Sequence, residues 1–164
     1  MYTFRRWRMY LAIFTFAALQ ATALNSININ GFKPDVIFIS VVFFGLYGAS
    51  LTGLEAGLVA GFLVSAFSIS APWVNILIYG LSGYIVGYNY NRFFKENIFA
   101  QIFLSFFGIS VAYSAYYIYS VFFDIPYVSG AFLNLIIPTA LYTGMVSPII
   151  FYLLKRFVRP VRYI

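Results

Sequence analysis

The feature that most constrains this chain is a stretch of 38 residues, Val36 to Trp73, with a single charged side chain, Glu55. A membrane-spanning helix needs about 20 apolar residues, so the stretch is too long for one crossing and long enough for two. Small turn-forming residues mark a reversal near its middle: Gly45, Gly48, Ser50, Thr52 and Gly53. The stretch is therefore predicted to form two helices joined by a tight turn.

The composition of the whole chain agrees with this. Hydrophobic residues make up 63% of its 164 residues and charged residues 9%, whereas soluble proteins average about 45–50% apolar and about 25% charged. Four acids and ten bases cannot cover a soluble protein of this size. We therefore exclude a soluble globular domain and a disordered chain, and predict an all-α integral membrane protein with a single domain over residues 1–164.

Polar and charged breaks divide the chain into six apolar segments. The breaks lie at Asn25 to Asp35, at the turn near Gly48, at Ala71-Pro72, at Asn91 to Asn97, and at Asp124 to Pro126. Each segment between them has a length close to that of a spanning helix. We therefore predict one bundle of six transmembrane helices, at roughly 9–27, 34–50, 53–70, 73–90, 98–123 and 132–155.

The distribution of bases predicts that both termini are cytoplasmic, because inner segments of membrane proteins are enriched in Lys and Arg. With six alternating helices, one base, Lys33, falls in an outer loop. The nine others fall on inner segments: Arg5, Arg6, Arg8, Arg92, Lys95, Lys155, Arg156, Arg159 and Arg162. A five-helix count would place the basic C-terminal tail outside. The basic ends are expected to be anchored to anionic lipids.

The N-terminus also has the features of a cleavable secretory signal. Three arginines precede an apolar run, and Ala21-Thr22-Ala23 has the form of an Ala-x-Ala cleavage site. Cleavage would leave five helices. We favour an uncleaved first helix, because a multispanning protein needs no cleavable signal and the charge distribution supports six.

The residues that usually carry catalysis or bind metals are scarce. The chain contains no Cys and no His, which excludes thiolate nucleophiles and Cys-ligated zinc and removes the commonest general base. Glu55 lies about one turn into its helix, close enough to the cytoplasmic face to snorkel, and no second carboxylate is near it in sequence. We find no P-loop, dinucleotide-binding or metal signature. These observations predict no enzyme activity, no cofactor and no metal, and the boundary position of the bases indicates no nucleic-acid partner.

Small residues recur at helical spacing and predict close helix contacts. Three sets stand out, one on each of three successive predicted helices: Gly53, Gly57, Gly61 and Ser65; Gly80, Gly83 and Gly87; and Ser105, Gly108, Ala112 and Ala115. Such a stripe either seals the protein's own bundle or docks the membrane helix of a partner, and both interpretations stay open. Asn75 and Asn134 are expected near outer helix ends, and Pro138 and Pro148 are expected to bend the last helix.

The order of these motifs resembles a known family. Lys33-Pro34-Asp35 opens an apolar helix, the stripe from Gly53 to Ser65 follows, and Asn75 leads into Gly80, Gly83 and Gly87. With the chain length, the six-helix layout, Asn134 and the basic end, this pattern is similar to that of the rod shape-determining protein MreD family. In one respect the chain departs from the family: Ser65 stands where an acid is frequent.

The resemblance implies a non-enzymatic, multi-pass component of the bacterial cell-elongation machinery, located in the bacterial cytoplasmic (inner) membrane. Such proteins pair with the bitopic scaffold MreC, and through it influence RodA, a penicillin-binding transpeptidase and MreB in organising peptidoglycan synthesis. We expect the stripe at Gly53, Gly57, Gly61 and Ser65 to hold the partner's helix. The family's fold is similar to that of the substrate-binding S components of vitamin transporters, so the alternative function is a small-molecule uptake subunit. A proton-coupled transporter is disfavoured by the lack of a midplane acid or histidine.

Overall fold

A computed structural model describes residues 2–3, 5–22, 32–67, 72–89, 91, 96–123, 132–158 and 161–162. The described residues form five helices and one pair of two-residue strands. In chain order, the elements are β1 (Tyr2–Thr3), α1 (Arg6–Ala21), α2 (Val36–Ala66), α3 (Pro72–Tyr88), α4 (Ile98–Phe122), α5 (Phe132–Val158) and β2 (Val161–Arg162). The predicted helical class is confirmed.

The prediction of six separate helices is corrected to five, because residues 36–66 form one helix with an internal break. At Ala49 the backbone adopts φ 69° and ψ −174°, while helical hydrogen bonding resumes directly on both sides. A Cβ added to Gly53 would lie 2.8 Å from the Cα of Gly45. Residues eight apart in a straight helix are about 12 Å apart, so the chain doubles back at Ala49. We call residues 36–48 the central arm of α2 and residues 50–66 its second arm.

The central arm forms the core of the protein. Every residue from Val36 to Gly48 is buried, as expected for a helix that is apolar on all sides. Within it, the rings of Phe43 and Tyr47 stack with centroids 4.7 Å apart, and Phe43 meets Phe151 of α5 edge to face at 5.4 Å. The other helices surround this arm.

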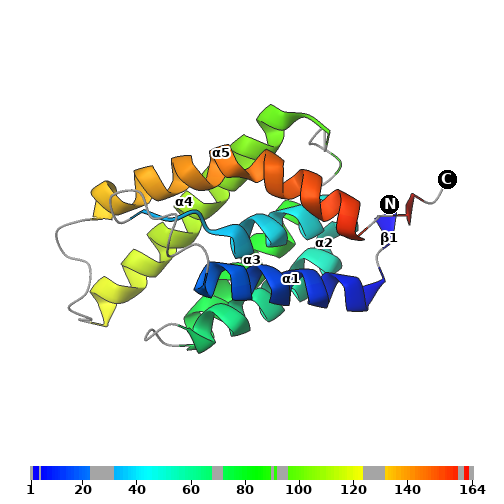
Figure 1. Ribbon diagram of the computed structural model, residues 1–164. Coiled ribbons are helices and arrows are strands. Elements are labelled where there is room, and N and C mark those ends of the chain that lie inside the picture. Colours follow the sequence, from blue (N-terminus) through cyan, green and yellow to red (C-terminus); the bar gives the residue numbers. More distant parts are fainter. Residues whose placement is uncertain are drawn as a thin grey trace.

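Figure 1 shows how the surrounding helices are arranged. The long helices α4 and α5 lie along one side of the bundle, and α1 lies with the second arm of α2 along the other. Both chain termini lie at the same end, where β1 and β2 pair antiparallel with Tyr2 opposite Arg162 and Thr3 opposite Val161. This strand pair was not predicted, since two-residue strands leave no periodicity to detect.

Most helix boundaries lie close to the predicted ones. The predicted segments 73–90, 98–123 and 132–155 correspond to α3, α4 and α5. The first helix begins earlier than predicted, at Arg6, and ends at Ala21, while the second arm of α2 ends at Ala66. Residues 23–27 and 68–70 of the predicted segments lie outside the described residues. Proline does fall inside α5, at Pro138 and Pro148.

The number of helices that could span a membrane differs from the prediction. Among the described residues, three helices are long and apolar enough by length and composition: α2, α4 and the part of α5 from Ile136 to Val158. Helices α1 and α3 have 16 and 17 residues, which is below or at the short limit of the usual range for a spanning helix.

Candidate functional site

The small-residue stripe of the second arm lies against α3. A Cβ added to Gly53 would be 2.1 Å from the carbonyl oxygen of Gly83, and one added to Gly83 would be 2.0 Å from the carbonyl oxygen of Gly53. At Gly57 the nearest atom would be the carbonyl oxygen of Tyr79, at 2.2 Å, and Gly61 lies against the backbone at Asn75 in the same way. These neighbours are backbone atoms, so only glycine permits the two helices to come this close.

The same interface continues to both ends of the helix pair. Gly87 of α3 packs on the backbone of Ala49, where α2 doubles back. At the other end the hydroxyl of Ser65 lies 2.7 Å from the carbonyl oxygen of Gly61 and 2.9 Å from that of Pro72. A hydroxyl donates a hydrogen bond to such oxygens, whereas an ionised carboxylate would repel them. Ser65 therefore suits this position better than an ionised acid would.

These contacts bear on the expected partner site. The face carrying Gly53, Gly57, Gly61 and Ser65 is covered by α3 of the same chain, and Gly83 and Gly87 lie in that same contact. A partner helix could reach the stripe only by displacing α3. A docking surface must therefore be sought elsewhere on the bundle.

A buried polar cluster joins four helices near the start of the central arm. Asp35, which is 3% exposed, caps α2 by accepting a hydrogen bond from the backbone N–H of Phe38 at 2.9 Å, and its second oxygen accepts one from the hydroxyl of Tyr79 in α3. The N–H of Asp35 donates to Thr143 Oγ1 of α5 at 3.0 Å, and the N–H of Ile37 donates to Gln20 Oε1 of α1 at 3.1 Å. We call Gln20, Asp35, Tyr79 and Thr143 the polar cluster.

The polar cluster fixes the register of the four helices relative to one another along the bundle axis. A buried polar group is costly unless it is hydrogen-bonded, so the cluster is satisfied in one register of α1, α2, α3 and α5. Thr143 is the twelfth residue of α5, so Asp35 lies well inside the bundle. Sequence reasoning assigned Asp35 to an outer loop and missed the cluster. Its one signal was an Asp directly before an apolar helix, the usual pattern of an N-cap.

Charged residues gather at the end of the bundle that carries the termini. Arg6 Nη1 lies 3.7 Å from Glu55 Oε1, and the hydroxyl of Tyr10 also donates to Glu55. Glu55 was expected to snorkel, and the structure pairs it with α1. Arg8 donates to the carbonyl oxygen of Val158 at 3.4 Å, which links α1 to the last residue of α5.

A second ion pair at this end joins α5 to the segment before α4. Lys155 donates to Glu96 Oε2, the Tyr47 hydroxyl donates to Glu96 Oε1 at 3.2 Å, and Lys155 lies 5.4 Å from the centre of the Tyr47 ring. The hydrogen bond from Lys155 lowers the pKa of the Glu96 carboxyl below its ordinary value. Among the other predicted anchor residues, Arg5 and Arg156 are exposed, Arg162 belongs to β2, and Arg159 lies outside the described residues.

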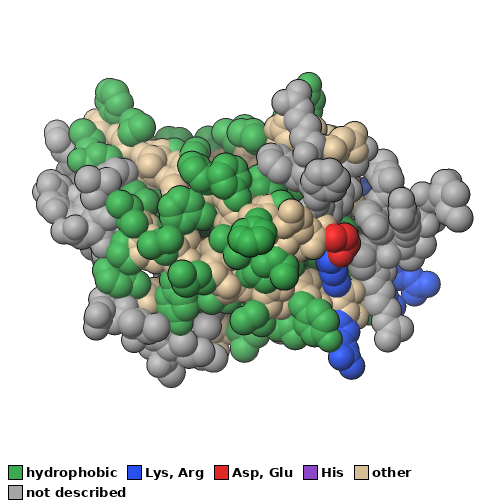
Figure 2. Space-filling model, turned by 90° about the horizontal axis from the view of Figure 1, so that it is seen from above, with side chains coloured by type: hydrophobic (Ala, Val, Ile, Leu, Met, Phe, Trp, Pro, Cys, Tyr) green, Lys and Arg blue, Asp and Glu red, His purple; other side chains and the backbone are tan. Residues whose placement is uncertain are grey.

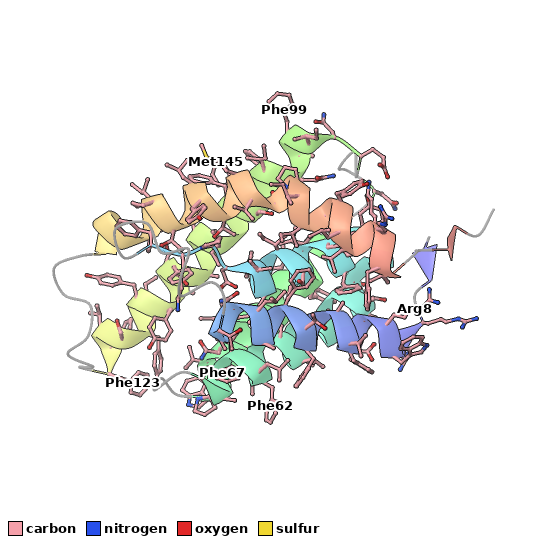
Figure 3. All side chains as sticks on the ribbon, in the orientation of Figure 1. Arg8, Phe62, Phe67, Phe99, Phe123 and Met145 are labelled. Atoms are coloured by element: carbon pink, nitrogen blue, oxygen red, sulfur yellow. The ribbon has the colours of Figure 1, made fainter. Side chains whose placement is uncertain are left out.

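The face formed by α4 and α5 is apolar and hollowed. Figure 2 shows hydrophobic side chains over most of the described part of this face, with charged side chains at the end that carries the termini. A cavity of about 550 Å³ lies between the two helices. Its floor includes Ala100 and Gly144, and Phe99 and Met145, at its rim, point away from the bundle in Figure 3. We call this cavity the α4–α5 groove; its further lining residues are Ile102, Phe103, Phe106 and Leu141.

One comparison with known proteins identifies the family. The family model for the rod shape-determining protein MreD matches residues 1–161, which is essentially the whole chain. The chain belongs to the MreD family. No curated protein and no solved structure matches it.

Membership of the MreD family gives the coarse function and location. The chain is a rod shape-determining membrane protein. The MreD family is not known as a family of enzymes. The three helices that are long and apolar enough to span a membrane agree with this membrane location.

Proposed function

We propose that this MreD protein acts without catalysis in the bacterial inner membrane, by binding an MreC-like bitopic scaffold and so helping to organise peptidoglycan synthesis. Two observations support the proposal. The family match extends over residues 1–161, and the bundle presents an apolar groove of the size that a helix face fills. Through the scaffold, the protein would influence RodA, a penicillin-binding transpeptidase and MreB.

The proposed topology has six crossings with both termini in the cytoplasm. The two arms of α2 run in opposite directions from Ala49 and each counts as one crossing. The shared position of the chain ends in Figure 1 supports an even number of crossings. Basic residues at that end, including Arg6, Arg8 and Lys155, support its cytoplasmic side.

We place the scaffold's membrane helix in the α4–α5 groove. The groove is apolar, and Ala100, which lines it, is small enough to let a second backbone approach closely. Its lining residues lie between positions 99 and 106 of α4 and between 141 and 145 of α5, so the proposed contact extends over about two turns of a partner helix. The stripe at Gly53 is already covered by α3.

Co-purification with an MreC-like protein tests this placement. Ala100→Leu fills the groove and is expected to reduce the co-purified scaffold about tenfold, because bulky groups at a small-residue contact separate the helices. The matched control is Leu81→Ala on the lipid-facing side of α3, where Leu81 is 56% exposed, and it should retain the scaffold. Folded yield is measured for each variant. Wild-type scaffold levels with folded Ala100→Leu would contradict the groove as the docking surface.

Topology is tested separately by single-cysteine labelling, which is clean because the chain has no native Cys. Cysteines at positions 30 and 128, which lie outside the described residues, should react with an impermeant reagent in intact cells. A cysteine at Arg5 should react only after permeabilisation. The reverse pattern would overturn the topology and leave the docking test unaffected.

A further inference from the structure

A second groove lies between α1 and the second arm of α2. Its volume is about 470 Å³, and the four residues of α1 that line it are all exposed. Exposed apolar surface of this kind marks a contact with another molecule or with the membrane. We call this cavity the α1–α2 groove; its lining residues are Trp7, Tyr10, Leu11, Phe14, Val59 and Leu63.

The two helices that form this groove run in the same direction. At one end, Arg6 and the hydroxyl of Tyr10 contact Glu55, near the start of the second arm. Beyond the other end, Gln20 of α1 and Phe67, which follows α2, line one small cavity. The α1–α2 groove therefore leads from the level of Arg6, at the end that carries the termini, toward the opposite end of the bundle.

The surroundings of the groove change from charged to apolar along its length. At its first end the side chain of Arg6 is 79% exposed, and the preceding residue, Arg5, is exposed as well. Farther along, the exposed side chains of α1 are Leu11 and Phe14. The lining of α1 from Trp7 to Phe14 extends over about 10 Å. A molecule that fits this pattern has a polar group at one end and an apolar chain behind it.

The charge at the first end of the groove is positive. Among the described residues there, Arg5, Arg6 and Arg8 outnumber one acid, Glu55, and the first turn of α1 contains no acidic residue. Arg6 Nη1 lies 3.7 Å from Glu55 Oε1, so other N–H groups of this exposed guanidinium can donate to a phosphate. The polar group that this end favours is therefore an anion.

Two aromatic residues place this end at a membrane–water interface. Trp7 and Tyr10 both line the groove, and tryptophan and tyrosine favour the level of the lipid headgroups. The guanidinium of Arg8 lies 5.3 Å from the centre of the Trp7 ring, and Figure 3 shows Arg8 at the start of α1, beside the chain termini. The cationic end of the groove is thus at the level where a phospholipid has its phosphate.

We propose that the α1–α2 groove is a binding site for one anionic phospholipid, with the phosphate at Arg6 and an acyl chain lying along the groove toward Phe14 and Leu63. This goes beyond a general attraction of basic chain ends to the membrane, because it assigns one lipid to one cavity. A partner helix would need an acidic side chain at the level of Arg6, whereas an anionic phospholipid has its phosphate next to its acyl chains. The inference rests on the membrane crossing by α1 that is part of the proposed topology.

Fluorescence quenching tests the site with a native reporter, because Trp7 lines the groove. The chain has two tryptophans, so Trp73→Phe leaves Trp7 alone. The full chain is reconstituted in phosphatidylcholine vesicles that contain equal fractions of either brominated phosphatidylglycerol or brominated phosphatidylcholine. The control reporter is Leu81→Trp in a chain whose native tryptophans are both replaced by Phe; Leu81 is 56% exposed on α3.

Brominated phosphatidylglycerol should quench Trp7 with about fivefold higher apparent affinity than brominated phosphatidylcholine, the factor expected for one arginine beside an anionic headgroup. At the Leu81→Trp reporter the two lipids should quench about equally. Arg6→Gln should abolish the preference at Trp7. Arg156→Gln removes the same charge from an exposed position of α5 and should leave the preference unchanged. If Arg6→Gln does not fold, Val59→Phe, which fills the groove and keeps the arginines, should abolish the preference instead.

Equal quenching of Trp7 by the two lipids, or equal losses in Arg6→Gln and Arg156→Gln, would overturn the inference while the topology stands. Protection of Trp7 from every brominated lipid would also overturn it, because a second copy of the chain or water would then occupy the groove. Arg6→Gln should still co-purify the MreC-like scaffold at the wild-type level. A failure of the lipid site is therefore distinguishable from a failure of the scaffold site in the α4–α5 groove.

Discussion

The two helix pairs α2–α3 and α4–α5 are packed in different ways. Between the second arm of α2 and α3 the backbones touch, since a Cβ added to Gly57 would lie 2.2 Å from a carbonyl oxygen. Between α4 and α5 the corresponding residue is Gly144, where an added Cβ would lie 3.3 Å from the carbonyl oxygen of Ile102. The most apolar stretch of α2 is 78% buried and that of α4 is 28% buried. Close backbone contact holds α2 and α3 in one fixed arrangement, and the looser packing of α4 on α5 leaves a groove.

The largest expected difference comes from adding one methyl group to each pair. Gly57→Ala forces α3 away from the second arm and should reduce the free energy of unfolding by about 3 kcal/mol, at the upper end of the usual cost of overpacking. In Gly144→Ala the new Cβ would lie 3.3 Å from the carbonyl oxygen of Ile102, a tight contact that a shift of a few tenths of an ångström relieves, so the change should cost about 1 kcal/mol. Thermal unfolding in mild detergent measures both. Equal costs would remove the distinction between the two pairs.

A smaller loss of stability is expected from changes in the polar cluster, which connects α2 and α3 to α1 and α5. Tyr79→Phe deletes the hydroxyl that donates to Asp35 and leaves a buried carboxyl oxygen short of a donor. Such a loss costs about 2 kcal/mol. Tyr84→Phe on the same helix is the control, because Tyr84 is 40% exposed. If both variants unfold at the same temperature, the cluster does not hold the helices in register.

A substitution at Ala49, where the two arms of α2 meet, is expected to increase stability. The Ala49 φ of 69° with ψ of −174° belongs to a region that only glycine adopts without strain. Ala49→Gly should raise the free energy of unfolding by about 1 kcal/mol, since the relief of strain exceeds the entropy that glycine adds to the unfolded chain. Ala66→Gly at the end of the same helix should instead lower stability. An unchanged or lower melting temperature for Ala49→Gly would show that the doubled-back geometry is unstrained.

The smallest effect is expected at Glu96, which links the α4–α5 side to the central arm. Lys155 lowers the pKa of the Glu96 carboxyl in the folded protein. The folded protein therefore binds fewer protons at Glu96 than the unfolded chain does. The contribution of Glu96 is complete above the ordinary pKa of 4.5 and is lost as the pH falls through the folded value. Glu96→Gln should remove this pH dependence and cost less than about 1 kcal/mol, since the Glu96 side chain is 74% exposed. Denaturation series at pH 7 and pH 4 compare the variant with the wild type.

Much of the fold could be predicted from the sequence, because apolar runs and their breaks determine where helices lie. The reversal was predicted between the segments 34–50 and 53–70, and it lies at Ala49, two residues before that boundary. The count of helices differed because the chain turns on one residue, without a loop that would separate two elements. The short strands at the termini left no pattern, since two residues cannot show alternation.

The candidate site was less predictable, and the reason is geometric. Spacing showed that Gly53, Gly57 and Gly61 share one face, but not which helix covers that face. The contact between Asp35 and Tyr79 joins residues 44 positions apart, and nothing local to either residue indicates the other. The α4–α5 groove arises from a gap between two helices, and a gap depends on the crossing geometry of α4 and α5.

Site-specific cross-linking to an MreC-like scaffold tests the central claim most directly. Single cysteines are placed at Met145 in the α4–α5 groove and at Leu81 on α3, which are 69% and 56% exposed. Each is paired with cysteines along the scaffold's membrane helix in cells that express both proteins, and disulfide formation is measured. The account predicts cross-links at position 145, with helical periodicity along the scaffold, and none at position 81. Cross-links at position 81 and none at position 145 would contradict it.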